Sequence, residues 1–529
     1  MATASPALPS GAAGAAPGAA AERRRFFAFM CMVFGMFMAI LDIQIVSASL
    51  AEIQAGLAAS ADEISWVQTS YLIAEVVMIP LSGFLSRALS TRWLFAICCG
   101  GFTAASFLCA TASNIDQMIV YRALQGFIGG GMIPTVFAAA FTIFPRSKLP
   151  IVTPLIGLVA TLAPTIGPTV GGYLTELFSW HWLFLINVIP GIFVTIATVV
   201  LVDFDEPDLG LLEHFDFAGL LLMAGFLGAL EYVLEEGSKV GWFDDPLISG
   251  MAALSAACAA MFFWRISVAR EPVVRLNAFA NRNFAAGAAF SFVMGIGLYG
   301  LTYLYPVYLS RVRGYSALMI GETMFVTGVA MFLTAPIAGR LMTKLDPRMM
   351  MAIGFGGFAL GTWIASGITK DWDFWELLVP QILRGCSLML AMVPISNVSL
   401  GTLPAAMVKN ASGLFNLTRN LGGAVGLAVI NTMLNNRIDL HLVRLHEQVT
   451  WSRDVAVERL GTMALGMAKL GDLADDAALK KLASIVRQQA TVMAFGDVFV
   501  LLTILFAGML CALPLMTRPS QIGGGGGGH

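Results

Sequence analysis

The sequence predicts an all-α protein that crosses a lipid bilayer many times. Of its 529 residues, 57% are hydrophobic and only 12% are charged, whereas about a quarter of the residues in a soluble domain carry charge. The hydrocarbon core of a membrane is about 30 Å thick and requires about 20 apolar residues per helix. The chain is therefore long enough for a dozen or more spanning helices joined by short loops.

Fourteen apolar segments have the length of a membrane span, and we expect each one to form a helix. The first six lie at 26–50, 64–86, 93–112, 116–142, 150–174 and 182–202. Two follow at 216–234 and 247–266, and the last six lie at 284–309, 315–342, 349–368, 376–400, 411–434 and 491–515. The predicted order is six helices, then two, then six.

Basic residues predict the side of the membrane on which each loop lies. If the N-terminus lies in the cytoplasm and each span changes the side, sixteen Lys and Arg fall on the cytoplasmic side and only four in short external loops. The sixteen are Arg23, Arg24, Arg25, Arg87, Arg92, Arg146, Lys148, Arg265, Arg270, Arg275, Arg282, Arg340, Lys344, Arg348, Lys409 and Arg518, and the four are Lys239, Arg311, Arg313 and Lys370. This asymmetry follows the positive-inside rule and predicts that both termini are cytoplasmic. The loop from Asp203 to Asp216 does not follow the rule, because it has five Asp or Glu before His214 and no Lys or Arg.

An internal repeat links the first group of six helices to the last. The residues Pro80, Gly83, Leu85, Leu89 and Arg92 recur at identical offsets as Pro336, Gly339, Leu341, Leu345 and Arg348. Each copy follows the second helix of its group. We therefore predict two six-helix halves related by duplication, with the middle pair of helices as an insertion.

These features divide the chain into five parts. Residues 1–25 form a tail rich in Ala, Gly, Pro and Ser, which we expect to be disordered. The N-terminal half covers 26–202, the linking helices and their loops 203–283, the C-terminal half 284–515, and a tail with a glycine run, taken as a flexible linker, 516–529. Within the C-terminal half, a polar segment at about 435–490 lies outside the cytoplasm in this topology. It has an apolar stripe at helical spacing, formed by Ile438, Leu442, Leu445 and Val449.

Several function classes lack the residues that they need. The net charge is -2, and no basic run of the kind that binds nucleic acid occurs. All seven cysteines lie in apolar segments without metal-binding spacing, so neither a metal site nor a disulfide framework is predicted. The glycine pattern at 295–300 lies inside an apolar span and follows no strand, and no ATP-binding or common hydrolase motif occurs. We expect a protein that is not an enzyme, has no cofactor and takes its energy from an ion gradient.

Ionisable residues inside the predicted spans are functional candidates, because each costs about 2.5–3.5 kcal/mol to insert. Asp42, Glu75 and Arg122 lie at depth. A buried carboxylate takes up or releases a proton when a neighbouring arginine leaves or approaches, so these three predict proton coupling. The alternative is that they pair statically and lock helices together. Glu231 lies nearer the outer interface and is a weaker candidate.

Three short motifs in the first half are similar to motifs of a known family. They are LDIQIV at 41–46, WVQTSY at 66–71 and RALQGFIGG at 122–130. They resemble helices 1, 2 and 4 of the fourteen-helix drug:proton antiporters in the major facilitator superfamily, most of all the EmrB type. The resemblance extends from about residue 26 to 515 and implies the major facilitator fold, with two inserted helices between its halves. It also implies that the arginine of the third motif takes part in proton transfer.

The most specific match is APTIGPTVGGY at 163–173, which resembles the antiporter signature in helix 5 of that family. Its motif residues are Pro164, Gly167, Pro168, Gly171 and Gly172. Gly167 and Gly171 lie on one helix face and allow a partner helix to approach closely, while the prolines remove backbone donors and soften the helix. The alternative is an ordinary helix contact.

The family's cytoplasmic gating motif after helix 2 is matched in part. The matching positions are Gly83, Arg87 and Arg92, with Gly339 and Arg348 in the second half. The chain departs from the family pattern because Arg87 stands where an acid is usual and Ser90 where a second glycine is usual. A charge latch of the standard kind is therefore not expected from this motif alone.

A central cavity between the halves is the expected substrate site. Candidates for its lining, beside the three proton-coupling residues, are Gln44, Gln125, Glu322, Arg384, Asn416 and Arg419. For Arg384 and Arg419, a structural role near a helix end is equally open.

The resemblance implies a bacterial inner-membrane exporter of lipophilic or amphipathic molecules in exchange for protons, surrounded by membrane lipids. An EmrB-type exporter further implies a tripartite pump, with a periplasmic adaptor (an EmrA-like membrane fusion protein) and an outer-membrane channel. Segment 435–490 is the expected docking surface for the adaptor, or else it lies on the membrane by its apolar stripe. Two other functions stay open: export of an anionic metabolite or siderophore-like compound, and a receptor or scaffold without transport.

Overall fold

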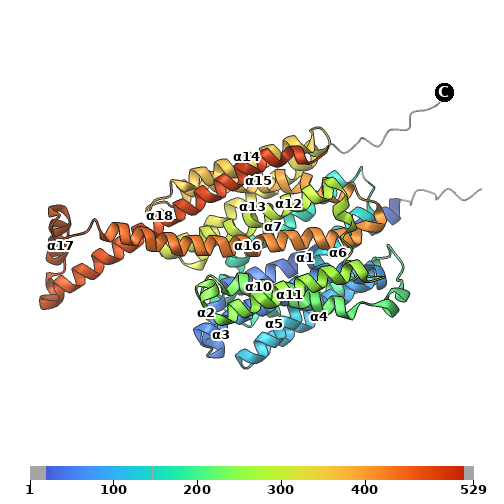
Figure 1. The fold of residues 1–529 in the computed structure, drawn as a ribbon, viewed down its shortest axis with the longest axis horizontal. Coiled ribbons are helices and arrows are strands. Elements are labelled where there is room, and N and C mark those ends of the chain that lie inside the picture. The colour runs from blue at the N-terminus through green and yellow to red at the C-terminus, as the bar shows by residue number, and fades with distance from the viewer. Residues whose placement is uncertain (1–18, 146, 518–529) are drawn as a thin grey trace, which may run out of the picture.

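The computed structural model describes residues 19–145 and 147–517, and this part of the chain consists of helices joined by loops. The predicted disordered tail falls mainly on residues 1–18 and the glycine run on 518–529, so both lie outside the described residues, as do Arg146 and Arg518. Figure 1 shows a bundle in which most helices follow the long axis.

The first six predicted spans are present in chain order. The helices are α1 (Ala19–Ala48), α2 (Leu50–Leu57), α3 (Ala61–Ala88), α4 (Ser90–Ala110), α5 (Ile115–Gly129), α6 (Met132–Ile143), α7 (Leu149–Leu177), α8 (Trp182–Leu185) and α9 (Val188–Leu201). The fourth span is divided into α5 and α6, and the sixth into α8 and α9. Three consecutive glycines at 129–131 explain the first of these breaks, because glycine weakens a helix.

The linking segment and the second half follow. The linking segment contains η1 (Leu209–His214), α10 (Phe217–Glu236), η2 (Trp242–Asp244), α11 (Pro246–Val268) and η3 (Leu276–Ala280). The second half contains α12 (Arg282–Tyr308), η4 (Leu309–Arg313), α13 (Ala317–Met342), α14 (Pro347–Ser366), α15 (Phe374–Gly401), α16 (Ala405–His446), α17 (Asp454–Gly466), η5 (Ala468–Leu473), α18 (Ala474–Ala512) and η6 (Leu513–Leu515).

Fourteen helical stretches of the described residues are long enough to cross a membrane. Twelve are both long and apolar enough. The other two are α7, with 29 residues, and α16, with 42, both longer than the about 20 residues that a span requires. The predicted all-α polytopic fold is confirmed, and the fourteen stretches follow the predicted order of six, two and six.

Polar caps begin several of these helices. Ser60 and Glu63 form a capping box at the start of α3, and Asp373 and Glu376 form another at α15. At α11 the Asp245 carboxylate accepts hydrogen bonds from two backbone N–H groups of the first turn. Such caps satisfy backbone donors that have no partner within the helix. They therefore help to place the boundary between each apolar span and its loop.

The two halves meet through equivalent helices. α3, the second helix of the first half, packs against α16, the fifth of the second half, and α13 packs in the same way against α7. The repeated glycines lie at these crossings. A Cβ added at Gly83 would lie 2.9 Å from Asn410 Cα, and one at Gly339 would lie 3.2 Å from Pro154 Cγ. Each copy of the repeat therefore keeps a small residue where the opposite half approaches.

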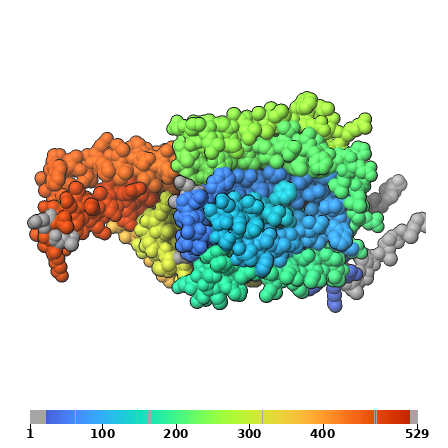
Figure 2. All heavy atoms as spheres, turned by 90° about the horizontal axis from the view of Figure 1, so that it is seen from below, coloured from blue at the N-terminus to red at the C-terminus, as the bar shows by residue number. Residues whose placement is uncertain are grey.

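The two inserted helices occupy different positions. α10 packs against α3 and α16 and so touches both halves, whereas α11 packs against α10 and is largely exposed. Arg265 Nε lies 3.0 Å from Asp216 Oδ1 and joins the pair. Figure 2 shows this pair in green beside the blue first half.

Two core helices are longer than predicted and form a projection, defined here as residues 435–490. α16 continues to His446 and α18 begins at Ala474, and α17 lies between them at the tip (Figure 1). The projection extends beyond the rest of the bundle along the axes of α16 and α18 (Figures 1 and 2), so it does not lie flat across the end of the bundle. We call this the projecting end, and the end at which α1 begins the opposite end.

Contacts between α16 and α18 support the base of the projection. His441 Nε2 lies 2.9 Å and Arg437 Nε 3.5 Å from Asp497 Oδ2. In the predicted stripe, Ile438, Leu442 and Leu445 are partly buried, while Val449 is exposed. Because Ile438 packs on the main core, the first part of the stripe serves helix packing.

Candidate functional site

A cavity of about 700 Å³ lies between the two halves, and we call it the central cavity. Its walls come from α1, α3, α7, α10, α12, η4, α13 and α16. It extends from Glu75 and Asn420 in the middle of the bundle to Ser47, Lys239 and Asn435 toward the projecting end. Polar lining residues include Gln44, Gln68, Glu75, Glu231, Glu235, Tyr299, Thr302, Tyr303, Asn420 and Asn431. Apolar lining residues include Ile43, Leu72, Val76, Leu234, Val307, Ile320 and Leu427. The cavity therefore combines apolar surface with hydrogen-bonding groups, as small-molecule sites do.

The halves are in direct contact on the other side of the cavity. The rings of Phe137 and Phe415 lie 6.3 Å apart, and the Ser412 hydroxyl donates to the Pro134 carbonyl at 2.6 Å. A Cβ added at Gly413 would lie 3.0 Å from the Ile79 carbonyl oxygen. The cavity is thus closed toward the opposite end, which is one state of an alternating-access transporter.

Asp42 and Arg122 form a fully buried ion pair inside the first half. Arg122 Nη1 lies 2.7 Å from Asp42 Oδ2 and donates to Gln125 Oε1 at 2.7 Å, and both charged side chains have zero exposure. Asn187 Nδ2 donates to Asp42 Oδ1 at 2.7 Å. Gln125 Nε2 in turn donates to Ser106 Oγ at 2.7 Å. A buried pair is stable only with such additional hydrogen bonds, because both charges have left water.

The structure corrects where two of the three predicted coupling residues lie. Asp42 and Arg122 were expected around the cavity, but their carboxylate and guanidinium are enclosed by the polar network and are not part of the cavity lining. Glu75 does line the cavity and is 4% exposed. Tyr71 connects the two places, because it lies one helical turn before Glu75 and its ring centroid is 4.2 Å from Arg122 Cζ.

Among the six other predicted cavity residues, Gln44 lines the cavity described and the remaining five do not. Gln125 belongs to the buried network, and Glu322 is exposed outside the cavity. Hydropathy indicates how deep in the membrane a residue lies, but not the direction in which its side chain points. The positions of these residues therefore differ from the prediction.

The three remaining candidates lie behind the cavity surface. Arg384 hydrogen-bonds Thr302, which is a lining residue. Arg419 Nη2 donates to Asn416 Oδ1 at 2.7 Å, and its Cζ lies 5.5 Å from the ring centroid of Phe137, in the closed seam below the cavity. Several guanidinium nitrogens of these two arginines have no hydrogen-bond partner among the described residues.

Sequence reasoning underrated the contribution of α10. Glu231 was placed near the outer interface, yet it is 6% exposed and lines the central cavity with Glu235. The signal was present, because Glu231 is an acid inside a predicted span. Tyr299, Tyr303 and Asn431 were not found, since neutral polar residues are common in spanning helices and carry no such signal.

The antiporter signature lies where α7 meets α1. A Cβ added at Gly171 would lie 3.0 Å from the Ile45 carbonyl oxygen, and one at Gly167 would be 3.3 Å from the backbone carbonyl carbon of Gln44. Pro168 lines the cavity, and Gly172 is partly buried. The Pro164 side chain lies outside the described part of the chain. Since α7 also packs against α13, the signature helix contacts both halves.

The acidic loop after α9 supplies a charge that the gating motif lacks. The Asp205 carboxylate pairs with Lys409 of α16 and accepts hydrogen bonds from Thr91 N and Thr91 Oγ1 at 3.0 and 3.1 Å. Lys409 Nζ also donates to the Ser86 carbonyl at 2.9 Å. Arg87, in contrast, has two guanidinium nitrogens without a partner among the described residues. The linking segment thus joins the two halves at the opposite end through Asp205.

Each of the other two motif arginines contacts the segment that follows its own half, and these contacts do not join the two halves. Arg92 Nη2 lies 2.5 Å from Asp203 Oδ1, and Arg348 donates to the Met516 carbonyl. The excess of acids in the loop from Asp203 to Asp216 therefore has a partial structural reason, because Asp203, Asp205 and Asp216 each pair with a basic residue.

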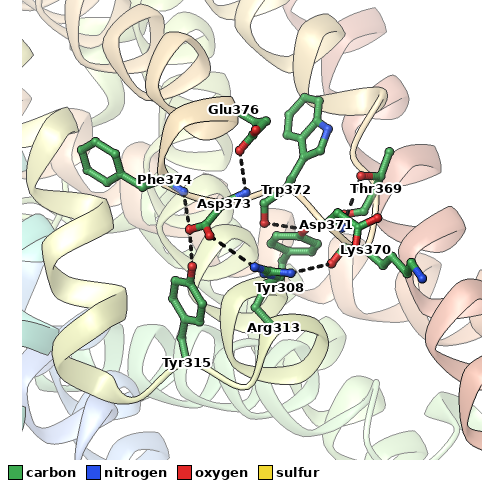
Figure 3. Close-up of polar contacts among 10 residues, drawn as sticks. All are labelled: Tyr308, Arg313, Tyr315, Thr369, Lys370, Asp371, Trp372, Asp373, Phe374 and Glu376. Atoms are coloured by element: carbon green, nitrogen blue, oxygen red, sulfur yellow. Dashed lines mark hydrogen bonds and ion pairs between the residues drawn. The ribbon is translucent and has the colours of Figure 1, made fainter.

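A polar cluster stabilises the second half at the projecting end (Figure 3). Arg313 Nη2 lies 3.3 Å from Asp373 Oδ2, and Arg313 Nη1 donates to the Lys370 carbonyl at 3.2 Å. The Tyr315 hydroxyl donates to Asp373, and this bond contributes most to lowering the pKa of the Asp373 carboxyl below its usual value. Because η4 also lines the cavity, the cluster holds one side of the cavity mouth.

No group of three or more His, Cys, Asp or Glu that suits a metal ion occurs among the described residues. The titratable side chains of the site instead pair with Arg and Lys or face the cavity.

Comparison with known proteins agrees with this geometry. The family model of the Major Facilitator Superfamily matches residues 32–427. The chain is 41% identical over 481 residues to the colistin resistance protein EmrB of Acinetobacter baumannii, covering 90% of this chain and 93% of that protein. It is 28% identical to the multidrug export protein EmrB of Escherichia coli, covering 93% and 95%.

Solved structures show the same fold. The human organic anion transporter MFSD10 aligns with a TM-score of 0.57 at 12% identity, covering 92% of this chain and 99% of that one. The proton:xylose symporter XylE aligns with a TM-score of 0.57 at 12% identity, covering 92% and 96%. The chain therefore belongs to the major facilitator superfamily of membrane transporters and, within it, to the EmrB-type drug exporters.

Proposed function

We propose that this chain exports lipophilic or amphipathic small molecules in exchange for protons. The observation that carries the proposal is the central cavity, which is closed at one end and has Glu75 in its wall next to the buried Asp42–Arg122 network. The names of the relatives, colistin resistance and multidrug export, support this class of cargo. No cofactor is needed, because the proton gradient supplies the energy.

Proton exchange acts on the contacts of Arg122 in this proposal. Breaking one partner of a buried ion pair costs about 3–5 kcal/mol, so protonation of Asp42 releases Arg122 from its strongest contact. Arg122 packs over Tyr71, and Tyr71 is one turn from Glu75 on α3. A proton on Asp42 therefore changes the wall that carries Glu75, and the two halves rock around the cavity.

The orientation in the membrane is also a proposal. We place the opposite end, which holds Lys148, Arg282, Lys344 and Lys409, in the cytoplasm of a bacterial inner membrane, because short cytoplasmic loops are rich in Lys and Arg. Both termini then lie in the cytoplasm. In this proposed orientation the cavity opens toward the periplasm, which is the state that releases cargo.

The projection is the proposed docking surface for a periplasmic adaptor that leads to an outer-membrane channel. Apolar side chains are exposed at its tip, with Trp451 at 77%, Val455 at 79% and Leu465 at 79% exposure. We take these side chains as part of one apolar surface, because contiguous exposed apolar patches mark interaction surfaces. A variant in which residues 447–473 are replaced by a short Gly-Ser linker should lose drug resistance in cells but keep transport in proteoliposomes. Loss of both activities, or of neither, would contradict the docking role.

Flux in proteoliposomes with an imposed pH gradient tests the function. Asp42→Asn, Glu75→Gln and Arg122→Ala should each abolish movement of a lipophilic dye driven by the gradient. Glu52→Gln, which changes an exposed carboxylate on α2, is the matched control and should behave as the native chain. Full proton-driven flux in both Asp42→Asn and Glu75→Gln would show that the coupling assignment is wrong.

The two alternatives receive no specific support. An exporter of anionic metabolites would place arginines in the inner wall of the cavity, but Arg384 and Arg419 lie behind the lining described and Arg311 lies at the mouth. A receptor or scaffold would not need the network around Asp42. Absence of flux over a broad panel of compounds would favour that reading.

A further inference from the structure

The inserted helix α10 forms a wall of the central cavity that neither half provides. On one side it contacts α3, where Trp66 stacks on Tyr232 at 5.5 Å and the Thr69 hydroxyl donates to Glu236 Oε1 at 3.1 Å. On the other side it contacts α16, and Trp242 Nε1, just beyond α10, donates to Thr432 Oγ1 at 2.9 Å. α10 therefore closes the gap between α3 and α16 and presents its own side chains to the cavity.

The face of α10 toward the cavity is acidic. Glu231, Leu234 and Glu235 line the cavity, and their spacing of three and four residues from Glu231 places them on one face of α10; Ser238, just beyond the end of α10, lines it too. Glu231 is 94% buried, given its 6% exposure, yet it makes no hydrogen bond or ion pair with any described residue. Neither carboxylate oxygen is completely enclosed by protein, and Glu231 lines the cavity, so the carboxylate faces the cavity space. An unpaired carboxylate in this position needs a partner.

The charged groups around Glu231 do not provide that partner. Glu235 and Glu75 line the same cavity and carry the same sign. Lys239 lies at the mouth but pairs with Glu236, with Nζ 2.8 Å from Oε1. Arg311 lies at the mouth on η4. The inner part of the cavity therefore has three carboxylates and, among its described lining residues, no basic side chain.

Aromatic rings lie in the same part of the cavity. Tyr299 and Tyr303 line it, and each hydroxyl donates to an asparagine of α16, to Asn420 Oδ1 at 3.3 Å and to Asn431 Oδ1 at 2.6 Å. These bonds fix the two rings. Carboxylates beside tyrosine faces bind organic cations, through charge attraction and cation–π contact.

We propose that Glu231, with Glu235 on α10 and Glu75 on α3, forms a binding site for the positive charge of an amphipathic organic cation. Glu231 is then a specificity residue that acts on the charge of the cargo and is distinct from the Asp42–Arg122 network. The inference rests on the proposed export function for its physiological meaning, but binding at equilibrium tests it without transport.

Two ions of the same shape and opposite charge make the test selective. Binding of tetraphenylphosphonium and of tetraphenylborate to the purified full-length protein in detergent is measured by equilibrium dialysis. The native chain should bind the cation more tightly than the anion. Glu231→Gln should weaken binding of the cation by about tenfold or more and leave binding of the anion unchanged or improved, because a buried charged contact contributes at least a factor of ten. Glu52→Gln, the control, changes an exposed carboxylate on α2 that lies outside the cavity lining and should leave both affinities within about twofold.

Further variants separate charge from folding. Glu231→Asp keeps the charge and should retain the preference for the cation even if Glu231→Gln proves unstable. Binding of the cation within about twofold of the native value in a folded Glu231→Gln protein would overturn the proposal, and so would an equal loss for both ions. Flux of a neutral dye driven by a pH gradient in the native chain tests the proposed function separately. If the native chain shows no such flux, the proposed function fails, while the binding result still decides the role of Glu231.

Discussion

Replacing Asp205 tests whether the linking segment controls the closed end of the transporter. Asp205→Asn removes the charge that pairs with Lys409 and keeps a side chain of the same shape. Lys409 and Asp205 have side-chain exposures of 16% and 20%, so the contact is partly screened by water. Charge-assisted hydrogen bonds contribute about 1.5–3 kcal/mol, and exposure reduces the expected loss to about 1–2 kcal/mol. Because the contact joins the halves, this loss should raise the population with an open opposite end by about 5–30-fold.

Hydrogen exchange of the backbone measures that population directly, since exchange follows the fraction of open molecules. In Asp205→Asn, peptides covering residues 84–92 and 405–413 should exchange about 5–30-fold faster, while those in α14 should not change. Asp203→Asn is the matched control, because Asp203 belongs to the same loop but pairs with Arg92 of the first half instead of a residue of the second half, and its side chain is 75% exposed. The reasoning is refuted if both variants change exchange alike, or if Asp205→Asn changes nothing while Lys409→Gln does.

Three further predictions follow from contacts in the site. Gly171→Leu should abolish transport and lower the melting temperature, because even a Cβ would lie 3.0 Å from a carbonyl oxygen of α1; an active, equally stable variant would contradict the close contact. Asn187→Ala should lower the unfolding free energy by about 1–3 kcal/mol, because Asp42 loses a buried hydrogen bond, and an unchanged denaturant midpoint would argue against it. The pKa of Asp373 is lowered by the Tyr315 hydroxyl, so the stability it adds is present above its unfolded pKa and is lost as the pH falls through its folded pKa. Asp373→Asn should therefore flatten the acid side of the melting-temperature profile, and an identical profile would refute this.

Hydropathy predicted the helices well because lipid imposes one simple condition on them. α12 begins at Arg282 and α15 ends at Gly401, within two residues of the expected bounds. The condition does not apply outside the membrane, and there the predicted helices are shorter than the helices of the structure. α16 continues past residue 434 as a polar helix because it is supported by α18, through contacts such as that of His441 with Asp497, and pairing between distant segments has no hydropathy signal.

The site shows the same division between depth and direction. Asp42 and Arg122 were expected to be deep and to matter together, and they do form a buried pair. Their separation from the cavity depends on which way each helix is turned, on Asn187, whose amide donates to the Asp42 carboxylate, and on Gln125, whose amide oxygen accepts from Arg122. No local pattern indicates that an asparagine 145 positions away will complete this network.

The inserted segment supplies two groups of acidic residues that neither six-helix half provides. At the opposite end, the gating motif has Arg87 in place of an acid, and Asp205 from this segment supplies the negative charge to Lys409. In the cavity, Glu231 and Glu235 of α10 add acids at a wall that the two halves do not form. The contact that closes the opposite end and the proposed contact with the cargo thus come from one continuous stretch of chain, which consists of the loop before α10 and α10 itself. If binding of a cation draws α10 toward the cavity, the loop that carries Asp205 is the nearest element to transmit that movement. Binding of a cation should then change the rate of hydrogen exchange at residues 203–216 in the native chain but not in Glu231→Gln. If the cation does not change this rate in the native chain, the closing contact of Asp205 and the cargo contact of Glu231 act independently.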